Sequence, residues 1–287
     1  MNVDLVSGAL GAEVINFDLN YLNNKNFEKI KNFLLDHKVV FFRNQSLTLE
    51  KFIEIASMFG PVEEHAYVKG IEKYPQITRI IKAANEKNQW GEGWHSDVSY
   101  DLTPSKVIML KSLKIPPIGG DTVFSNMELA LETLGEDIKK IIQNKKAIHT
   151  SNGSKFFVEN YSKMKSNGKI GEQYSNKHPI IRTHPETGKK ILYVNPTYTK
   201  KIVGLPDDES SDLLNYIFKH QERLDLSCRF KWTENAIAIL DNRSTQHYAI
   251  ADFYPGRGLG HERVMDRISI VGDLSLIHIS EPTRRYS

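Results

Sequence analysis

Cysteine is nearly absent from this chain of 287 residues, which contains only Cys228. A single thiol cannot form an internal disulfide, so the disulfide-stapled folds of small secreted proteins are excluded. A lone cysteine ordinarily serves as a small buried apolar residue. We therefore expect Cys228 to lie in the core.

Long hydrophobic runs are absent as well. No stretch of about 18 apolar residues occurs, which is the length that a membrane-spanning helix requires. Residues 1–6 contain neither the basic region nor the apolar region of a secretory leader. We therefore expect no membrane association and a cytoplasmic location.

The chain also lacks a large excess of charge of either sign. The 38 basic and 35 acidic residues give a net charge of only +3. Basic pairs such as Lys145-Lys146 and Lys189-Lys190 are typical of solvated edges, so we expect no nucleic-acid partner. With 40% hydrophobic residues, the chain is long enough for one domain with a sizeable core.

We expect this domain to span residues 1–273. Within it, residues 148–173 are rich in Ser, Asn, Lys and Gly and show little periodicity. A segment of this length is typical of a mobile lid that covers an active site. A disordered insertion is the alternative. Residues 274–287 do not fit the pattern of the preceding sequence, and we interpret them as a non-native tail.

Many short apolar runs predict strands, and a few longer periodic segments predict helices. The predicted strands are 10–15, 39–42, 77–81, 107–110, 122–124, 228–232, 236–240 and 268–271, together with a hairpin over 178–194. The predicted helices are 27–35, 49–59, 127–134 and 207–221. Asn26, Thr48 and Asn126 (or Ser125) are the expected N-caps of the first three.

The most informative motif is His95-Ser96-Asp97. Side chains two residues apart share one face of a strand or of its exit, so the imidazole and the carboxylate can reach the same ion. Two histidines and one carboxylate leave adjacent positions open on a non-haem Fe(II). His247 is the best candidate for the third ligand. We interpret His178 and His184, each beside a proline, as structural.

A lone His-x-Asp is more often two polar residues on a surface strand, and the surrounding motifs decide between the two interpretations. Gly119-Gly120-Asp121-Thr122 follows, then His247, then Arg263-x-x-x-Arg267. From about residue 10 to 273, this order resembles the taurine dioxygenase family of Fe(II)- and 2-oxoglutarate-dependent dioxygenases. The resemblance implies a mainly β fold with flanking helices, the double-stranded β-helix or cupin-like jelly roll.

The resemblance also implies roles for individual residues. His95, Asp97 and His247 would hold Fe(II). Thr122 and Arg263 would bind the distal carboxylate of 2-oxoglutarate, for which arginine is suited by its planar, permanent charge.

Arg267 would face the metal as a catalytic residue, beside the 1-carboxylate of 2-oxoglutarate, and would anchor an anionic substrate. The interval from His247 to Arg263 is longer than in the taurine enzyme, which makes Arg257 the alternative to Arg263. Arg257 lies in a glycine-rich turn and is therefore better interpreted as a loop residue.

The resemblance places His65, Tyr67 and Tyr198 in the substrate pocket. An exposed loop is the alternative environment for His65. Gly91 stands four residues before His95, where the taurine enzyme has an asparagine that holds its substrate. This difference argues against taurine itself.

The implied activity is hydroxylation of a small organic anion, either a sulfonate, a sulfate ester or a carboxylate. O2 would be consumed and succinate and CO2 released, with ascorbate as the reductant in vitro. A homo-oligomer, dimer or tetramer, is the partner state common among relatives. The alternatives are a taurine dioxygenase proper, which releases sulfite, and a non-catalytic cupin-like metal-binding sensor.

Overall fold

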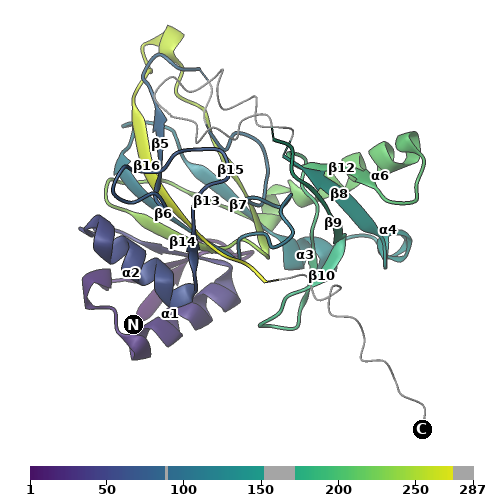
Figure 1. The fold of residues 1–287 in the computed structure, drawn as a ribbon, viewed down its shortest axis with the longest axis horizontal. Helices are drawn as coiled ribbons and strands as arrows, with labels where there is room; N and C mark the ends of the chain where they lie inside the picture. Colours follow the sequence, from purple (N-terminus) through teal and green to yellow (C-terminus); the bar gives the residue numbers. More distant parts are fainter. Residues whose placement is uncertain (88–89, 152–171, 274–287) are drawn as a thin grey trace.

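A computed structural model describes residues 1–87, 90–151 and 172–273 (Figure 1). Most of the predicted lid and all of the predicted non-native tail lie outside the described residues. Within the described part, no helix combines the length and the apolar character needed to cross a membrane. The architecture is mainly β with flanking helices, as predicted.

The strands are β1 (Asn2–Leu5), β2 (Ala12–Ile15), β3 (Val39–Phe42), β4 (Val62–Glu63), β5 (Thr78–Lys82), β6 (Val107–Lys114), β7 (Thr122–Asn126), β8 (Lys146–Thr150), β9 (Ser175–Pro179), β10 (Ile181–Thr183), β11 (Lys190–Leu192), β12 (Thr199–Ile202), β13 (Ser227–Phe230), β14 (Ile237–Asp241), β15 (Thr245–Ala249) and β16 (Arg263–Ile270). The α-helices are α1 (Asn24–His37), α2 (Leu49–Phe59), α3 (Met127–Glu132), α4 (Glu136–Ile142) and α6 (Asp207–Gln221), with 3₁₀ turns at η1 (Leu19–Tyr21), η3 (Leu224–Leu226) and η4 (Pro255–Arg257).

The largest sheet has the order β1-β2-β3-β14-β6-β16-β4, and β5 pairs with β16 beside it. Its strand β3 is buried on both faces, as its continuous run of Val and Phe predicts. Val40 and Phe42 pack with the residues of α1 and α2 on one face. Val39 and Phe41 enter a second core cluster on the other face. Figure 1 shows the two helices against this sheet.

A second sheet, β13-β7-β15, packs across that second cluster. The Phe41 ring of the large sheet stacks on the Phe230 ring of β13, with centroids 3.9 Å apart. Because side chains from both sheets fill the space between them, residues on the inner faces of β7, β15 and β16 come together there. The predicted metal and 2-oxoglutarate residues lie on these strands and on the segment before Val98.

A third group of elements lies at the side of the two sheets, on the right of Figure 1. It comprises the sheet β12-β8-β9, the hairpin β10-β11 and helices α3, α4 and α6. Its own apolar cluster includes Leu131, Ile180 and Leu214. Because α3 follows β7 directly, this group supports the C-terminal end of β7.

Most predicted elements are present, and the differences have local causes. Thr48 and Asn126 cap α2 and α3 as predicted, but α1 begins earlier than predicted. Its N-cap is Asn23, whose side chain accepts from the N–H of Asn26. Strand β8 occupies residues that we assigned in part to the lid, because its pairing with β9 and β12 is non-local. The last strand starts at Arg263, not at residue 268.

Cys228 is buried on β13, and burial raises the pKa of its thiol to about 12. At pH 8 the thiolate fraction is therefore ~10⁻⁴, and the thiolate is the reactive form. We expect an aromatic disulfide reagent to label Cys228 only after the protein is unfolded by guanidinium. Rapid labelling of the folded protein at pH 8 would contradict this burial.

Candidate metal centre

His95 and His247 lie side by side although they are far apart in the sequence. They form an isolated antiparallel bridge, in which the His95 N–H donates to the His247 carbonyl at 3.1 Å and the His247 N–H donates back at 2.9 Å. Their ring centroids are 4.2 Å apart. His247 belongs to β15, whereas His95 makes only this one bridge before the chain turns. Strand pairing therefore brings the two imidazoles together.

Asp97 completes the group. Its Oδ1 is 3.6 Å from His95 Nε2 and its Oδ2 is 3.8 Å from His247 Nε2. One ligand atom from each of the three residues lies within 4.8 Å of the others, and all three residues are buried. His95 Nδ1 lies 2.8 Å from the Gly93 carbonyl, to which it donates when protonated. That hydrogen bond leaves the Nε2 lone pair directed at the shared site.

The protonation states of these residues suit a cation. Burial lowers the pKa of His247 to about 3, so its imidazole is neutral at pH 7. Burial alone would raise the pKa of Asp97, but Arg267 and the two histidines outweigh it and hold that pKa well below its usual range. Neutral imidazole and ionised carboxylate are the ligand forms that a divalent metal needs. The donor set therefore fits a 2-His-1-carboxylate metal site.

A cavity adjoins the three residues. Besides His95, Asp97 and His247, its lining includes Thr122 on β7 and both Arg263 and Arg267 on β16. Alternate residues of a strand share a face, so Arg263, Met265 and Arg267 all point inward. The structure thus brings together every residue predicted for the metal and for 2-oxoglutarate.

Arg263 is a buried cation that has no ion pair within the described residues, and its Nε has no hydrogen-bond partner. Burial lowers its pKa to about 10 despite the opposing influence of Asp121. Beside it, the Thr122 hydroxyl accepts from Trp232 Nε1 at 2.9 Å, which leaves the hydroxyl hydrogen available for donation. A carboxylate entering this space would pair with the guanidinium and accept from Thr122.

The other two arginines have different surroundings. Arg267 Nε and Nη2 each lie 3.2 Å from Asp97 Oδ2, so its charge is partly matched by the metal carboxylate. Arg257 is exposed in η4, with its guanidinium 5.8 Å from the Tyr254 ring centroid. It does not line the cavity, and this placement favours Arg263 over Arg257.

The predicted substrate residues have different surroundings. The Tyr198 ring meets the His95 ring edge to face, with centroids 6.2 Å apart. His65 is half-buried, and burial together with the nearby charge of Arg267 lowers its pKa to about 3. Tyr67 is fully buried, and its hydroxyl lies 2.5 Å from the Ser151 hydroxyl and 3.0 Å from the Glu172 carbonyl.

The structure adds residues that we did not predict for the site. Trp232 orients Thr122, and Asn242 bonds the backbone at Asp97. Asn242 stands in the Asp-Asn-Arg stretch that precedes His247, which was the available sequence signal. His184 is no ligand, because its Nε2 bonds the Asp241 carboxylate at 2.8 Å.

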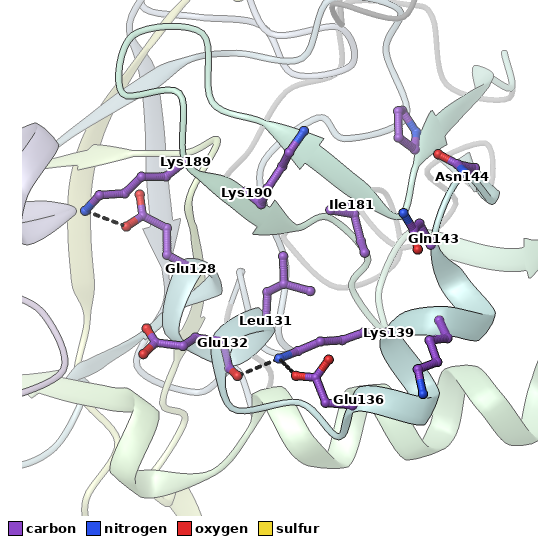
Figure 2. Close-up of a pocket in the computed structure, with 12 residues that line it drawn as sticks. Glu128, Leu131, Glu132, Glu136, Lys139, Gln143, Asn144, Ile181, Lys189 and Lys190 are labelled. Carbon is purple, nitrogen blue, oxygen red and sulfur yellow. Dashed lines mark hydrogen bonds and ion pairs between the residues drawn. The ribbon is translucent and has the colours of Figure 1, made fainter.

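A larger pocket, of about 680 Å³, lies elsewhere, between α3, α4 and the β10-β11 hairpin (Figure 2). Several of its charges are paired within it: Lys189 with Glu128 at 3.2 Å and Lys139 with Glu136 at 2.9 Å. It contains no cluster of metal-ligating groups within the described residues. Its size alone does not make it the functional site.

Comparison with known proteins agrees with this geometry. A family described as "Taurine catabolism dioxygenase TauD, TfdA family" matches residues 2–268. The chain belongs to this family. TauD/TfdA membership makes the protein a 2-oxoglutarate-dependent oxidoreductase that uses Fe(II), 2-oxoglutarate and O2.

Individual TauD/TfdA relatives differ in what their names say they act on. An alkylsulfatase of Acinetobacter baylyi is 33% identical over 281 residues, which are 94% of this chain and 84% of the relative. An alpha-ketoglutarate-dependent sulfonate dioxygenase of Saccharomyces cerevisiae is 29% identical over 88% of this chain, which spans 63% of the yeast protein. The crystal structure of a taurine dioxygenase from Burkholderia xenovorans has 31% identity and a TM-score of 0.79, covering 95% of this chain and 89% of that one.

Proposed function

We propose that His95, Asp97 and His247 hold Fe(II) and that the protein hydroxylates a small organic anion at this centre. The reaction would convert O2, 2-oxoglutarate and a substrate C–H bond into succinate, CO2 and an alcohol. The observation that carries the proposal is the convergence of three buried ligand atoms within 4.8 Å beside Thr122 and Arg263, an arginine that has no ion pair within the described residues. We further propose that the two facing sheets form the double-stranded β-helix of the family.

The iron would supply the oxidising chemistry when bound. Arg263 and Thr122 would hold the distal carboxylate of 2-oxoglutarate, so that its other end reaches the metal ligands. A metal-binding sensor would need the triad but not a buried arginine that lacks an ion pair among the residues the structure describes. The arginine has a desolvation cost in the free protein, and a carboxylate co-substrate explains its presence.

Gly91 supports a substrate other than taurine. A Cβ added there would lie 3.5 Å from His95 Cε1, and the glycine has φ +83°, a conformation that other residues rarely adopt. The missing side chain leaves room beside the metal ligands. We propose an alkyl sulfate or alkyl sulfonate as the substrate class, in line with the sulfate-ester and sulfonate names among the relatives.

The proposal is tested by succinate formation from 2-oxoglutarate under air with Fe(II) and ascorbate. Taurine, alkyl sulfonates, alkyl sulfates and aryloxyacetates are compared, with His95→Ala as the blank. We expect an alkyl sulfate or sulfonate to stimulate turnover most, because Gly91 opens the pocket. Preference for taurine would assign the protein as a taurine dioxygenase proper, and no His95-dependent succinate despite bound iron would favour the sensor.

Arg267→Ala is expected to raise the KM for the anionic substrate when 2-oxoglutarate is saturating. Loss of one partner of a buried charge pair costs about 2 kcal/mol or more, which corresponds to at least ~30-fold. Because Arg267 also contacts Asp97, Mn(II) affinity is measured in parallel to separate the two effects. An unchanged substrate KM would refute the anchoring role.

A further inference from the structure

We propose that Asn242 is a positioning residue that holds Asp97 in the geometry required for metal binding, against backbone strain at Val98. The inference rests on the proposed metal centre. It concerns the backbone on either side of Asp97, which the side chains of the three metal ligands do not hold in place.

The chain is strained immediately after Asp97. Val98 has φ +46°, in the left-handed region that β-branched residues strongly disfavour. Its side chain is nevertheless buried in an apolar cluster with Tyr67 and Tyr100. Packing therefore accounts for the valine, while the left-handed turn directs the chain away from the metal ligands directly after the carboxylate.

Asn242 binds the backbone on both sides of the Asp97 side chain. Its Oδ1 accepts from the Asp97 N–H at 2.7 Å, and its Nδ2 donates to the Asp97 carbonyl at 2.9 Å. The same Nδ2 donates to the Ser105 carbonyl at 2.8 Å. Asn242 is fully buried, so removing its side chain leaves these buried backbone groups without the partner they have in the intact protein.

The two residues before Asp97 are held by other bonds. The backbone bridge to His247 fixes His95, and the Ser96 hydroxyl donates to the Thr245 carbonyl at 2.7 Å. At Asp97, the backbone bonds come from Asn242 alone within the described residues. Without Asn242, the turn at Val98 is free to relax toward an ordinary φ and to rotate the carboxylate out of the site.

A matched control exists at Gln45. This residue is also buried, and its amide accepts from the Leu19 N–H at 2.8 Å. It donates to the carbonyls of Phe17 at 3.0 Å and Arg43 at 2.8 Å. Gln45 thus makes the same kinds of bonds as Asn242, but none of its partners lines the metal cavity. Its variants report the loss of stability alone.

The experiment measures Mn(II) binding to the metal-free protein by electron paramagnetic resonance, without 2-oxoglutarate. Asn242→Ala and Gln45→Ala remove the amide, whereas Asn242→Asp and Gln45→Glu keep the acceptor and place an oxygen against the two carbonyls. Thermal unfolding of each metal-free variant sets a temperature at which all are folded. The visible spectrum of bound Co(II) reports the coordination geometry.

We expect Asn242→Asp and Asn242→Ala to weaken Mn(II) binding by roughly 10- to 100-fold, the range for residues that orient a ligand, and to alter the Co(II) spectrum. The Gln45 variants should lose stability but keep their Mn(II) affinity. Unchanged affinity in both Asn242 variants, with His95→Ala unable to bind, would refute the positioning role and leave the triad intact. Equal losses at Asn242 and Gln45 would also refute it. Full affinity in His95→Ala would overturn the proposed metal centre and this inference together.

Discussion

His95→Ala is expected to abolish metal binding and 2-oxoglutarate turnover together. The variant removes a ligand whose Nε2 faces Asp97 at 3.6 Å in a buried site. The loss of Mn(II) affinity should exceed the roughly 10- to 100-fold that follows when an outer partner of a ligand is removed. Mn(II) affinity is measured by electron paramagnetic resonance, and succinate is measured under air with Fe(II).

His220→Ala is the matched control for this variant. His220 lies on α6, where its Nε2 is 2.9 Å from the Ala130 carbonyl, away from the cavity. The His220→Ala variant should keep both Mn(II) binding and succinate formation. If His95→Ala were folded and still bound Mn(II) like the unaltered protein, the three residues would not be the metal site.

Arg263→Met is expected to produce the second large effect, a loss of affinity for 2-oxoglutarate. Leaving one partner of a buried charge pair unmatched costs about 2–5 kcal/mol, or ~30- to 5,000-fold in Kd. The metal-free variant should be no less stable than the unaltered protein. Burial already lowers the pKa of Arg263 to about 10, which shows that the fold disfavours its charge when no anion is present.

Calorimetric titration of the Mn(II)-loaded protein with 2-oxoglutarate measures this Kd. Arg257→Ala serves as the control, because Arg257 is exposed in η4 and does not line the cavity. The Arg257→Ala variant should bind 2-oxoglutarate with an unchanged Kd. If Arg257→Ala greatly weakened 2-oxoglutarate binding while Arg263→Met kept a normal Kd, the assignment of the two arginines would be reversed.

Local sequence patterns predicted most of the secondary structure correctly. Helix α6 spans the predicted 207–221, and α2 spans the predicted 49–59 between Thr48 and Gly60. Helix α2 carries apolar periodicity, a capping side chain and a glycine stop, whereas α6 carries the apolar periodicity without a capping side chain or a glycine at its end. Strands β8 and β9 were missed or only partly predicted, because short polar strands depend on partners distant in the sequence.

The sequence by itself determined the residue types of the site. His95 and Asp97 are two positions apart, and Arg263 and Arg267 are four apart. Such spacings put each pair on a shared face wherever the backbone is extended. Together with the resemblance to the dioxygenase family, they were enough to predict the chemistry.

Only the tertiary structure decided how those groups meet. The bridge between His95 and His247 joins segments separated by a long stretch of chain, and no local pattern encodes such a pairing. Burial then distinguished Arg263 from the exposed Arg257. The left-handed turn at Val98 and the bonds from Asn242 have the same origin, because both depend on packing between segments that the sequence order keeps apart.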